Sequence, residues 1–178
     1  DNQNSSYNFS LLSDINRPIH FWKDRNMLKD IIKTYRDNPD KNIIIDSGGY
    51  DFNVSREIIL NSNLIITPIT VSQTEVDGLQ KFYSENVEIA LKSNPYIKPY
   101  ILLNRINYYD QKDAEDLITF IISEIPDYKV LSTALGARKD FKKAFSEGKS
   151  VVEYNKSSPA SQEISALVKE ISALIKNV

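Results

Sequence analysis

The sequence contains no cysteine, one histidine and one methionine, and it has no long hydrophobic run. The absence of cysteine excludes disulfides and thiolate metal sites, and it is compatible with a reducing cytoplasm. The apolar runs are too short to span a bilayer, and the first residues have neither the charged nor the apolar region of a signal peptide. The default expectation is therefore a soluble cytoplasmic protein without a membrane partner.

Neither sign of charge dominates the sequence. The 22 lysines and arginines nearly balance 24 acidic residues, so the net charge is −2. No global positive field points to nucleic acid, and any contact with DNA must be a local patch. The length of 178 residues, with 41% hydrophobic and 26% charged residues, fits one globular domain. Such a chain can bury roughly 70% of its unfolded surface, which is enough for a core.

The sequence has only five glycines, and they do not form a phosphate-binding loop. No G-x-x-x-x-G-K-[ST] segment occurs, which is the kind of loop whose amides and lysine hold a triphosphate. The stretch NIIIDSGGYDF nevertheless has a carboxylate of the kind that lies opposite such a loop in nucleotide sites. Its apolar run ends at Asp46 and is followed by Gly48 and Gly49. A carboxylate at the carboxyl end of a buried parallel strand is where nucleotide sites hold Mg²⁺.

Short apolar runs alternate with amphipathic helical patterns along most of the chain. This alternation predicts an α/β fold with three layers, a mostly parallel sheet flanked by helices, in a single domain spanning residues 1–178. The expected strands lie near 43–46, 64–69, 98–104 and 128–133, with a further short strand at 19–22. The expected helices lie near 25–37, 54–61, 73–92, 111–125 and 138–147, and Pro159 opens a last one.

Three segments carry a family likeness. The run IIIDSGGYDFNVSREIILNSNLIITPI has a strand ending in Asp, a small-residue turn, a helix and a strand with a proline near its end. The run ILLNRIN ends a strand in Asn-Arg, and LSTALGARKDFKKAFSEGKSVVEY leads from a strand through an arginine and a basic helix to the terminal helix. In this order they resemble the ParA-type partition ATPases, which are P-loop NTPases of the ParA/MinD group with a deviant phosphate-binding loop. The likeness covers nearly the whole chain.

The resemblance implies roles for individual residues. Asp46 would bind Mg²⁺ through water, Gly48 and Gly49 would form the turn that senses the γ-phosphate, and Asn104 would lie beside the adenine. Asp1 would help to position the attacking water. Each residue also has a simpler interpretation: Asp46 as a strand-end cap, the glycines as an ordinary turn, Asn104 as a loop amide, and Asp1 as a frayed terminus.

The resemblance also implies a DNA contact in the last third of the chain. Arg138, Lys139, Lys142 and Lys143 begin a concentration of positive charge that extends over residues 137–156. In the family, this region contributes to non-specific DNA binding by the ATP-bound dimer. The alternative interpretation is a solvated helix face.

The expected function is that of a DNA-partitioning ATPase. The family binds ATP and Mg²⁺ as a homodimer, associates with nucleoid DNA, and is reset when a centromere-binding, ParB-like partner stimulates hydrolysis. Its phosphate-binding loop has no counterpart in residues 1–178, so we expect this chain not to bind nucleotide by itself and to expose two apolar strand edges. The alternatives are a non-catalytic module of the same fold, and a MinD-like positioning ATPase. The second matches less well, because the last helix contains Glu163 and Glu170 where a basic membrane helix is expected.

Overall fold

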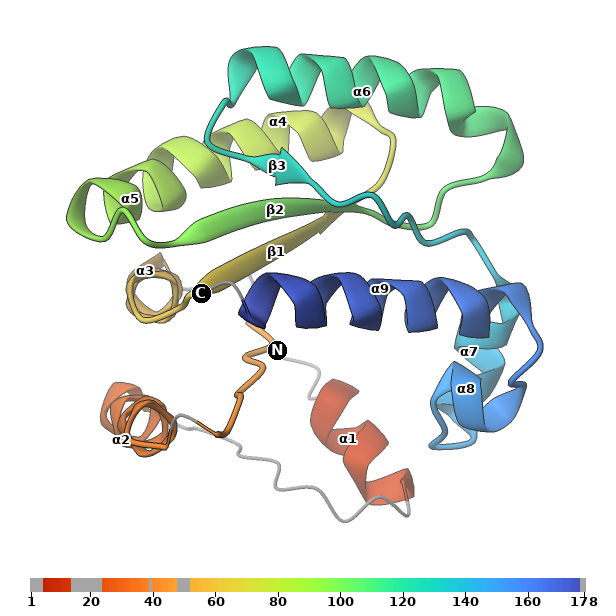
Figure 1. Ribbon diagram of the computed structural model, residues 1–178, viewed down its shortest axis with the longest axis horizontal. Coiled ribbons are helices and arrows are strands. Elements are labelled where there is room, and N and C mark those ends of the chain that lie inside the picture. The colour runs from red at the N-terminus through yellow and green to blue at the C-terminus, as the bar shows by residue number, and fades with distance from the viewer. Residues whose placement is uncertain (1–4, 14–23, 39, 48–51, 177–178) are drawn as a thin grey trace.

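The computed structural model describes residues 5–13, 24–38, 40–47 and 52–176. Within these residues, three parallel strands form one sheet in the order β1-β2-β3, with helices on both of its faces (Figure 1). The expected α/β class, a parallel sheet flanked by helices, is thereby confirmed. The strands are β1 (Leu64–Ile69), β2 (Lys98–Leu103) and β3 (Lys129–Val130).

Helices make up most of the rest of the described chain. A π-helical turn, Tyr83–Val87, joins α4 to α5, and a 3-10 turn, Tyr108–Asp110, precedes α6. The helices are α1 (Ser5–Leu12), α2 (Arg25–Arg36), α3 (Phe52–Leu60), α4 (Gln73–Phe82), α5 (Glu88–Ser93), α6 (Gln111–Glu124), α7 (Lys139–Ser146), α8 (Val151–Tyr154) and α9 (Pro159–Lys176).

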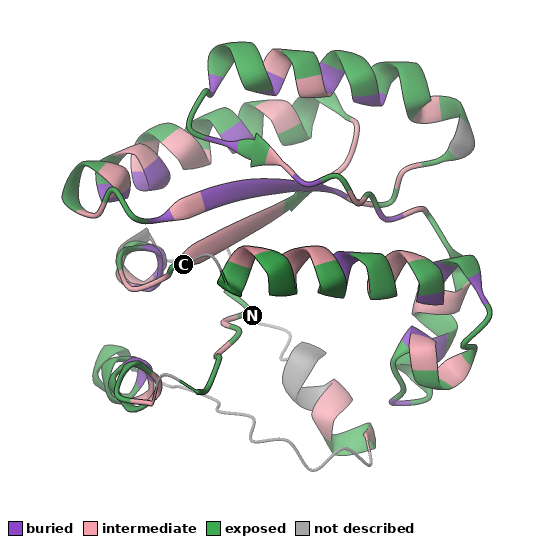
Figure 2. Ribbon diagram, viewed as in Figure 1, coloured by how far each residue is buried: buried purple, intermediate pink, exposed green. Residues whose placement is uncertain are grey.

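The central strand β2 is apolar because it is covered on both faces. Ile101 and Leu103 belong to the core that the sheet shares with α4, α5 and α6, whereas Tyr100 and Leu102 pack toward α9. After its first residue, every position of β2 is buried, as the purple ribbon in Figure 2 shows. A strand that is buried on both faces has a continuous apolar run in its sequence, and that run is what identified this strand.

The terminal helix α9 covers the second face of the sheet. Pro159 opens the helix, and the hydroxyl of Ser158 accepts a hydrogen bond from the Ser161 N–H at 3.1 Å, which satisfies one free donor of the first turn. Side chains at helical spacing then form one apolar stripe against the sheet. The stripe consists of Ile164, Leu167, Ile171 and Leu174.

The expected strand at Ile43–Asp46 is wrong, because residues 41–47 have no regular secondary structure. Ile45 packs against the small core formed by Leu28 and Ile32 of α2 with Ile58 of α3, whereas the side chain of Ile44 is 96% exposed. A single apolar strand is not stable without a hydrogen-bonded neighbour, and no described strand runs beside this segment. The expected strand at 19–22 lies outside the described residues.

Gly148 fastens α7 to the short helix α1, which the sequence did not lead us to expect. Its φ of +66° lies in the left-handed region, and a Cβ there would come within 2.4 Å of the Leu12 carbonyl oxygen. The rings of Phe9 and Phe145 stack beside this contact with their centroids 5.1 Å apart. A glycine is therefore required here for two reasons, backbone conformation and close approach.

Two glycine substitutions should change stability in opposite directions. Gly148→Ala should lower the free energy of unfolding by about 1–3 kcal/mol, because it adds backbone strain and a clash with α1. Gly78→Ala should raise it by roughly 0.5–1 kcal/mol, because this glycine lies within α4 and nothing lies within 4 Å of an added Cβ. Denaturant unfolding of both variants checks the pair. Equal effects of the same sign would contradict this account.

Candidate functional site

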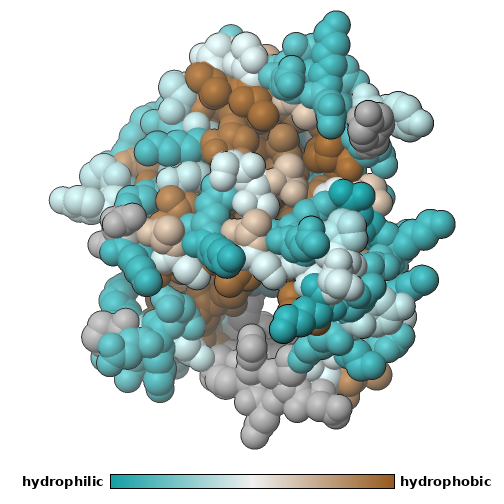
Figure 3. Space-filling view, turned by 45° about the vertical axis from the view of Figure 1, so that its right-hand side comes forward, coloured by the Kyte–Doolittle hydropathy of each residue, from teal (hydrophilic) through white to brown (hydrophobic). Residues whose placement is uncertain are grey.

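The loops that follow the strands gather at the carboxyl edge of the sheet, where open α/β sheets place their ligands. Asn104, the expected adenine-side residue, lies there directly after β2, and its N–H donates to the Ile69 carbonyl at 2.8 Å. An isolated bridge between Ile106 and Gly136 ties the loop after β2 to the loop after β3. With this edge turned forward, the surface is largely hydrophilic, with a hydrophobic area near the top of the view (Figure 3).

A glutamate of α9 holds the loop that follows β3. The Glu170 carboxylate accepts the backbone N–H of Ser132 at 2.7 Å, the Ser132 hydroxyl at 2.9 Å, and the N–H of Thr133 at 2.9 Å. Partial burial alone raises the pKa of Glu170, but the hydrogen bonds from Thr133 and Ser132 outweigh it and hold the pKa below its ordinary value. The ionised carboxylate is therefore the form that stabilises the loop.

Seven residues earlier in α9, a second glutamate holds the end of the same loop. Glu163 accepts the N–H of Gly136 at 3.0 Å and two bonds from the guanidinium of Arg138, at 3.0 and 2.7 Å. Arg138 was expected in the DNA-binding set, yet here it forms an ion pair with α9. Because its charge is largely compensated by Glu163, Arg138 acts first as a structural clamp in this arrangement.

The other three expected DNA-binding residues form an exposed surface. Lys139, Lys142 and Lys143 lie at positions i, i+3 and i+4 of α7, so they share one side of the helix, and all three side chains are exposed. We call this set the α7 lysine face. Unlike Arg138, these lysines form no ion pair with another described residue, which leaves the charge of this face available to a polyanion.

The expected metal residue lies in the segment that does not form a strand. Asp46 is exposed, and within the described ranges no group of three or more histidine, aspartate or glutamate side chains gathers in a way that could hold a metal ion. Gly48, Gly49 and Asp1 lie outside the described residues. Magnesium binding by Asp46 therefore stays a prediction, as do the roles of the two glycines and of Asp1.

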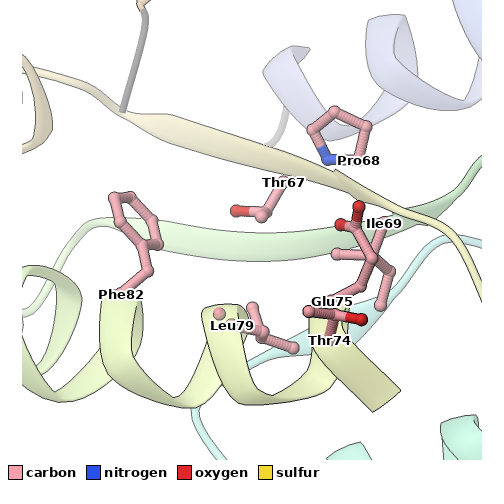
Figure 4. A pocket seen from close by; sticks show the side chains of 8 residues that line it. Thr67, Pro68, Ile69, Thr74, Glu75, Leu79 and Phe82 are labelled. Carbon is pink, nitrogen blue, oxygen red and sulfur yellow. The ribbon is translucent and has the colours of Figure 1, made fainter. Parts of the chain in front are cut away.

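A cavity of about 300 Å³ opens between β1 and α4, and the sequence did not reveal it. In Figure 4, Thr67, Ile69 and Phe82 point into this space, whereas the ring of Pro68 points away from it. The Thr67 hydroxyl lies 3.1 Å from the hydroxyl of Tyr128. Burial raises the pKa of Tyr128 to about 12, so its hydroxyl stays protonated at neutral pH. The one feature of the sequence that could have indicated this cavity is Gly78, a glycine in the middle of α4. The lining residues are Thr67, Pro68, Ile69, Thr74, Glu75, Gly78, Leu79 and Phe82.

Comparisons with known proteins add no family to this picture. No protein-family model matches the chain, and a search of curated proteins found no significant match. None of the helices in the described part of the chain has both the length and the hydropathy to cross a bilayer. The functional argument therefore depends on the geometry and on the sequence motifs.

The ionised form of Glu170 should contribute measurably to stability. Glu170→Gln removes the charge from three hydrogen bonds, so we expect the free energy of unfolding at neutral pH to fall by about 1–3 kcal/mol. Because the folded-state pKa lies below the ordinary value of 4.5, this contribution is complete above pH 4.5 and is lost as the pH falls through the folded-state pKa. Chemical denaturation at a series of pH values checks both points.

The exposed glutamate at the end of α6 provides a matched control for this experiment. Glu124→Gln makes the same chemical change at a side chain that forms no hydrogen bond with another described residue, so its effect should stay within about 0.5 kcal/mol. A difference between native protein and Glu170→Gln that did not shrink in acid would show that the charge of Glu170 is not what holds the loop.

Proposed function

We propose that this chain is part of a ParA-type partition ATPase, in which a further parallel strand, carrying the phosphate-binding loop, pairs with the free edge of β1. The single observation that carries the proposal is a combination of two features within the described residues: an apolar strand edge that no described strand pairs with, and an apolar segment that joins no described sheet. Both features are expected if the strand that belongs between them lies outside residues 1–178.

The free edge can be located residue by residue. The carbonyls of Asn63 and Ile69 accept hydrogen bonds from β2 at 3.0 and 2.8 Å, so the odd-numbered residues of β1 are bonded to β2. In a parallel strand, the residues between them direct their N–H and C=O groups to the opposite edge. These residues are Leu64, Ile66 and Pro68, and no described strand pairs there. Proline is tolerated at this position because its missing N–H faces that edge.

The segment Ile43–Asp46 has the composition of a strand that lacks its neighbour. Its three isoleucines are β-branched and favour extended structure, yet Ile44 is almost completely exposed. One strand inserted between this segment and β1 would give both a hydrogen-bonded partner. The family's phosphate-loop strand lies in the middle of its sheet, which is the arrangement that the two unpaired features require.

The cavity beside β1 supports the same strand position. It lies next to the free edge and is lined mainly by apolar groups, with open space at Gly78. A strand added to β1 would point every second side chain toward α4. A glycine in α4 lowers helix stability, so its presence beside an open cavity is consistent with space used by a side chain from an added strand.

The residues present fit only part of a nucleotide site. Asp46 and Asn104 are chemically suited to Mg²⁺ and adenine, but residues 1–178 contain no glycine loop with a lysine to hold the phosphates. Bound Mg²⁺ would neutralise the charge of the phosphates. In the proposed protein, ATP would join two subunits, the α7 lysine face would bind DNA without sequence preference, and a ParB-like partner would stimulate hydrolysis.

The packing of α9 does not match that of a membrane-binding helix of the MinD type. A MinD-like protein ends in a basic amphipathic helix that binds a membrane surface. The apolar stripe of α9 instead packs against Tyr100 and Leu102 of the sheet, and Glu163 and Glu170 are engaged with the loop after β3. This helix is therefore already used inside the fold.

The proposal predicts how nucleotide binding depends on the added strand. Residues 1–178 should show no micromolar ATP binding by calorimetry, whereas fusing a ParA-type phosphate-loop strand and first helix before Asp1 should give Mg²⁺-dependent binding and hydrolysis. Asp46→Ala in the fused protein should abolish hydrolysis and leave the circular dichroism spectrum unchanged. Micromolar ATP affinity of residues 1–178 alone, or full activity of the Asp46 variant, would contradict this account.

Hydrogen exchange tests the strand position independently of activity. The amides of Leu64 and Ile66 should exchange fast in residues 1–178 and slowly in the fused protein, while those of Ile65 and Thr67 are protected in both. Protection at the first two amides without ATP binding would favour the non-catalytic module. An unchanged exchange pattern in a folded fusion would rule out β1 as the acceptor.

The α7 lysine face should determine DNA affinity. Lys142→Glu with Lys143→Glu should weaken binding of the ATP-bound fused protein equally for unrelated DNA sequences, and should flatten the log–log salt slope by about 2. The matched control, Lys81→Glu with Lys112→Glu, makes the same change of net charge on α4 and α6. If both pairs weaken binding equally, net charge and not this surface governs the interaction.

A further inference from the structure

Arg105 has an unusual backbone conformation at the carboxyl edge of the sheet. Its φ is 57°, and it is the only residue other than glycine with a positive φ in the described part of the chain. A side chain with a Cβ is strained in this left-handed region, where glycine or asparagine is the common choice. Such strain persists only where the surrounding structure enforces it, and it is concentrated at functional sites.

The hydrogen bonds on either side of Arg105 enforce this conformation. Asn104 donates to the Ile69 carbonyl on the β1 side at 2.8 Å, whereas Ile106 donates to the Leu135 carbonyl on the β3 side at 3.0 Å. In a regular parallel strand, residues two apart bond to the same neighbour. Here they bond to opposite neighbours, so Arg105 is an extra residue of the β-bulge kind, a device that re-aims side chains beside active sites.

The side chain of Arg105 is also free. It is exposed and takes part in no hydrogen bond or ion pair with another described residue, and the half-buried side chain of Asn104 beside it makes no hydrogen bond to the described chain either. Every other arginine that the structure describes is engaged by an acceptor within the chain. The pairs are Arg25 with Glu57, Arg36 with Asn61, Arg56 with the Glu85 carbonyl, and Arg138 with Glu163.

We propose that Arg105 binds a phosphate group of a ligand at the carboxyl edge of the sheet. A guanidinium presents paired N–H groups that match phosphate oxygens, which a lysine cannot reproduce. The bulge places this group beyond the end of the central strand, which is the ligand position of open α/β sheets. The inference does not depend on the proposed ATPase, because it follows from the backbone of residues 104–106 and the unpartnered side chain of Arg105.

Pyrophosphate is a suitable probe for this site. In residues 1–178, the Nε–H resonance of Arg105 should shift saturably as pyrophosphate is added at constant ionic strength, and acetate should produce no saturable shift. Arg105→Lys should weaken binding, read from the resonances of the neighbouring amides, by about tenfold or more, since it removes a paired charged hydrogen bond. The matched control Lys112→Gln, which removes one exposed charge on α6, should leave the binding curve unchanged.

Stability measurements separate a binding role from a structural one. Arg105→Gly relieves the strain, so it should raise the melting temperature by about 2–4 °C. It should also abolish the saturable shift that pyrophosphate causes in the neighbouring amide resonances. Arg105→Asn, which also tolerates this φ, should behave in the same way and serves if the glycine variant misfolds. Unchanged pyrophosphate binding in either variant, or a response in native protein that stays linear, would overturn the proposal. A loss of both stability and binding would identify Arg105 as structural and would overturn it equally.

Discussion

The hydrogen-bonded ladder of β2 is the interaction on which the rest of the structure depends. This strand is buried on both faces and bonded on both edges, to β1 over six residue pairs and to β3 over two. Its side chains join the core under α4, α5 and α6 to the core under α9, so both helical layers are positioned by one strand. Because a buried backbone must be paired, β2 also determines where the neighbouring strands and their loops can lie.

The same requirement explains the less regular parts of the fold. Among the strands that the structure describes, β1 is bonded on one edge only, and Pro68 lies where its missing N–H faces the other edge. At the other end of the ladder, β3 is short, and two carboxylates of α9 take over as acceptors for the loop that follows it. Glu163 and Glu170 therefore accept the backbone N–H groups that a longer strand would pair. Glu163 also binds Arg138, directly before the start of α7.

The sequence predicted the elements well where one local signal was sufficient. Helices α2 and α4, capped by the side chains of Asp24 and Ser72, begin at the expected residues, and the strand at Leu64–Ile69 has the expected bounds. The prediction failed at Ile43–Asp46, where three isoleucines favour a strand but no neighbour accepts it. Arg138 was assigned to a DNA contact from the clustered charge and the family likeness, and its ion pair with Glu163, 25 positions later in the chain, has no sequence signature. The free Arg105, by contrast, stands in an Asn-Arg pair that sequence reasoning had associated with a strand end.

By itself, the sequence determined where β1 and β2 lie, where most of the helices begin, and the family likeness, because apolar periodicity and caps act within a few residues of each other. Only the tertiary structure decided which edge of β1 stays free, which arginines are neutralised, and that Arg105 is forced into a left-handed conformation. These properties arise from hydrogen bonds between residues 25 to 35 positions apart, such as Asn104 with Ile69 and Ile106 with Leu135. Local propensities carry no information about such partners, because pairing is settled by the register of the whole sheet.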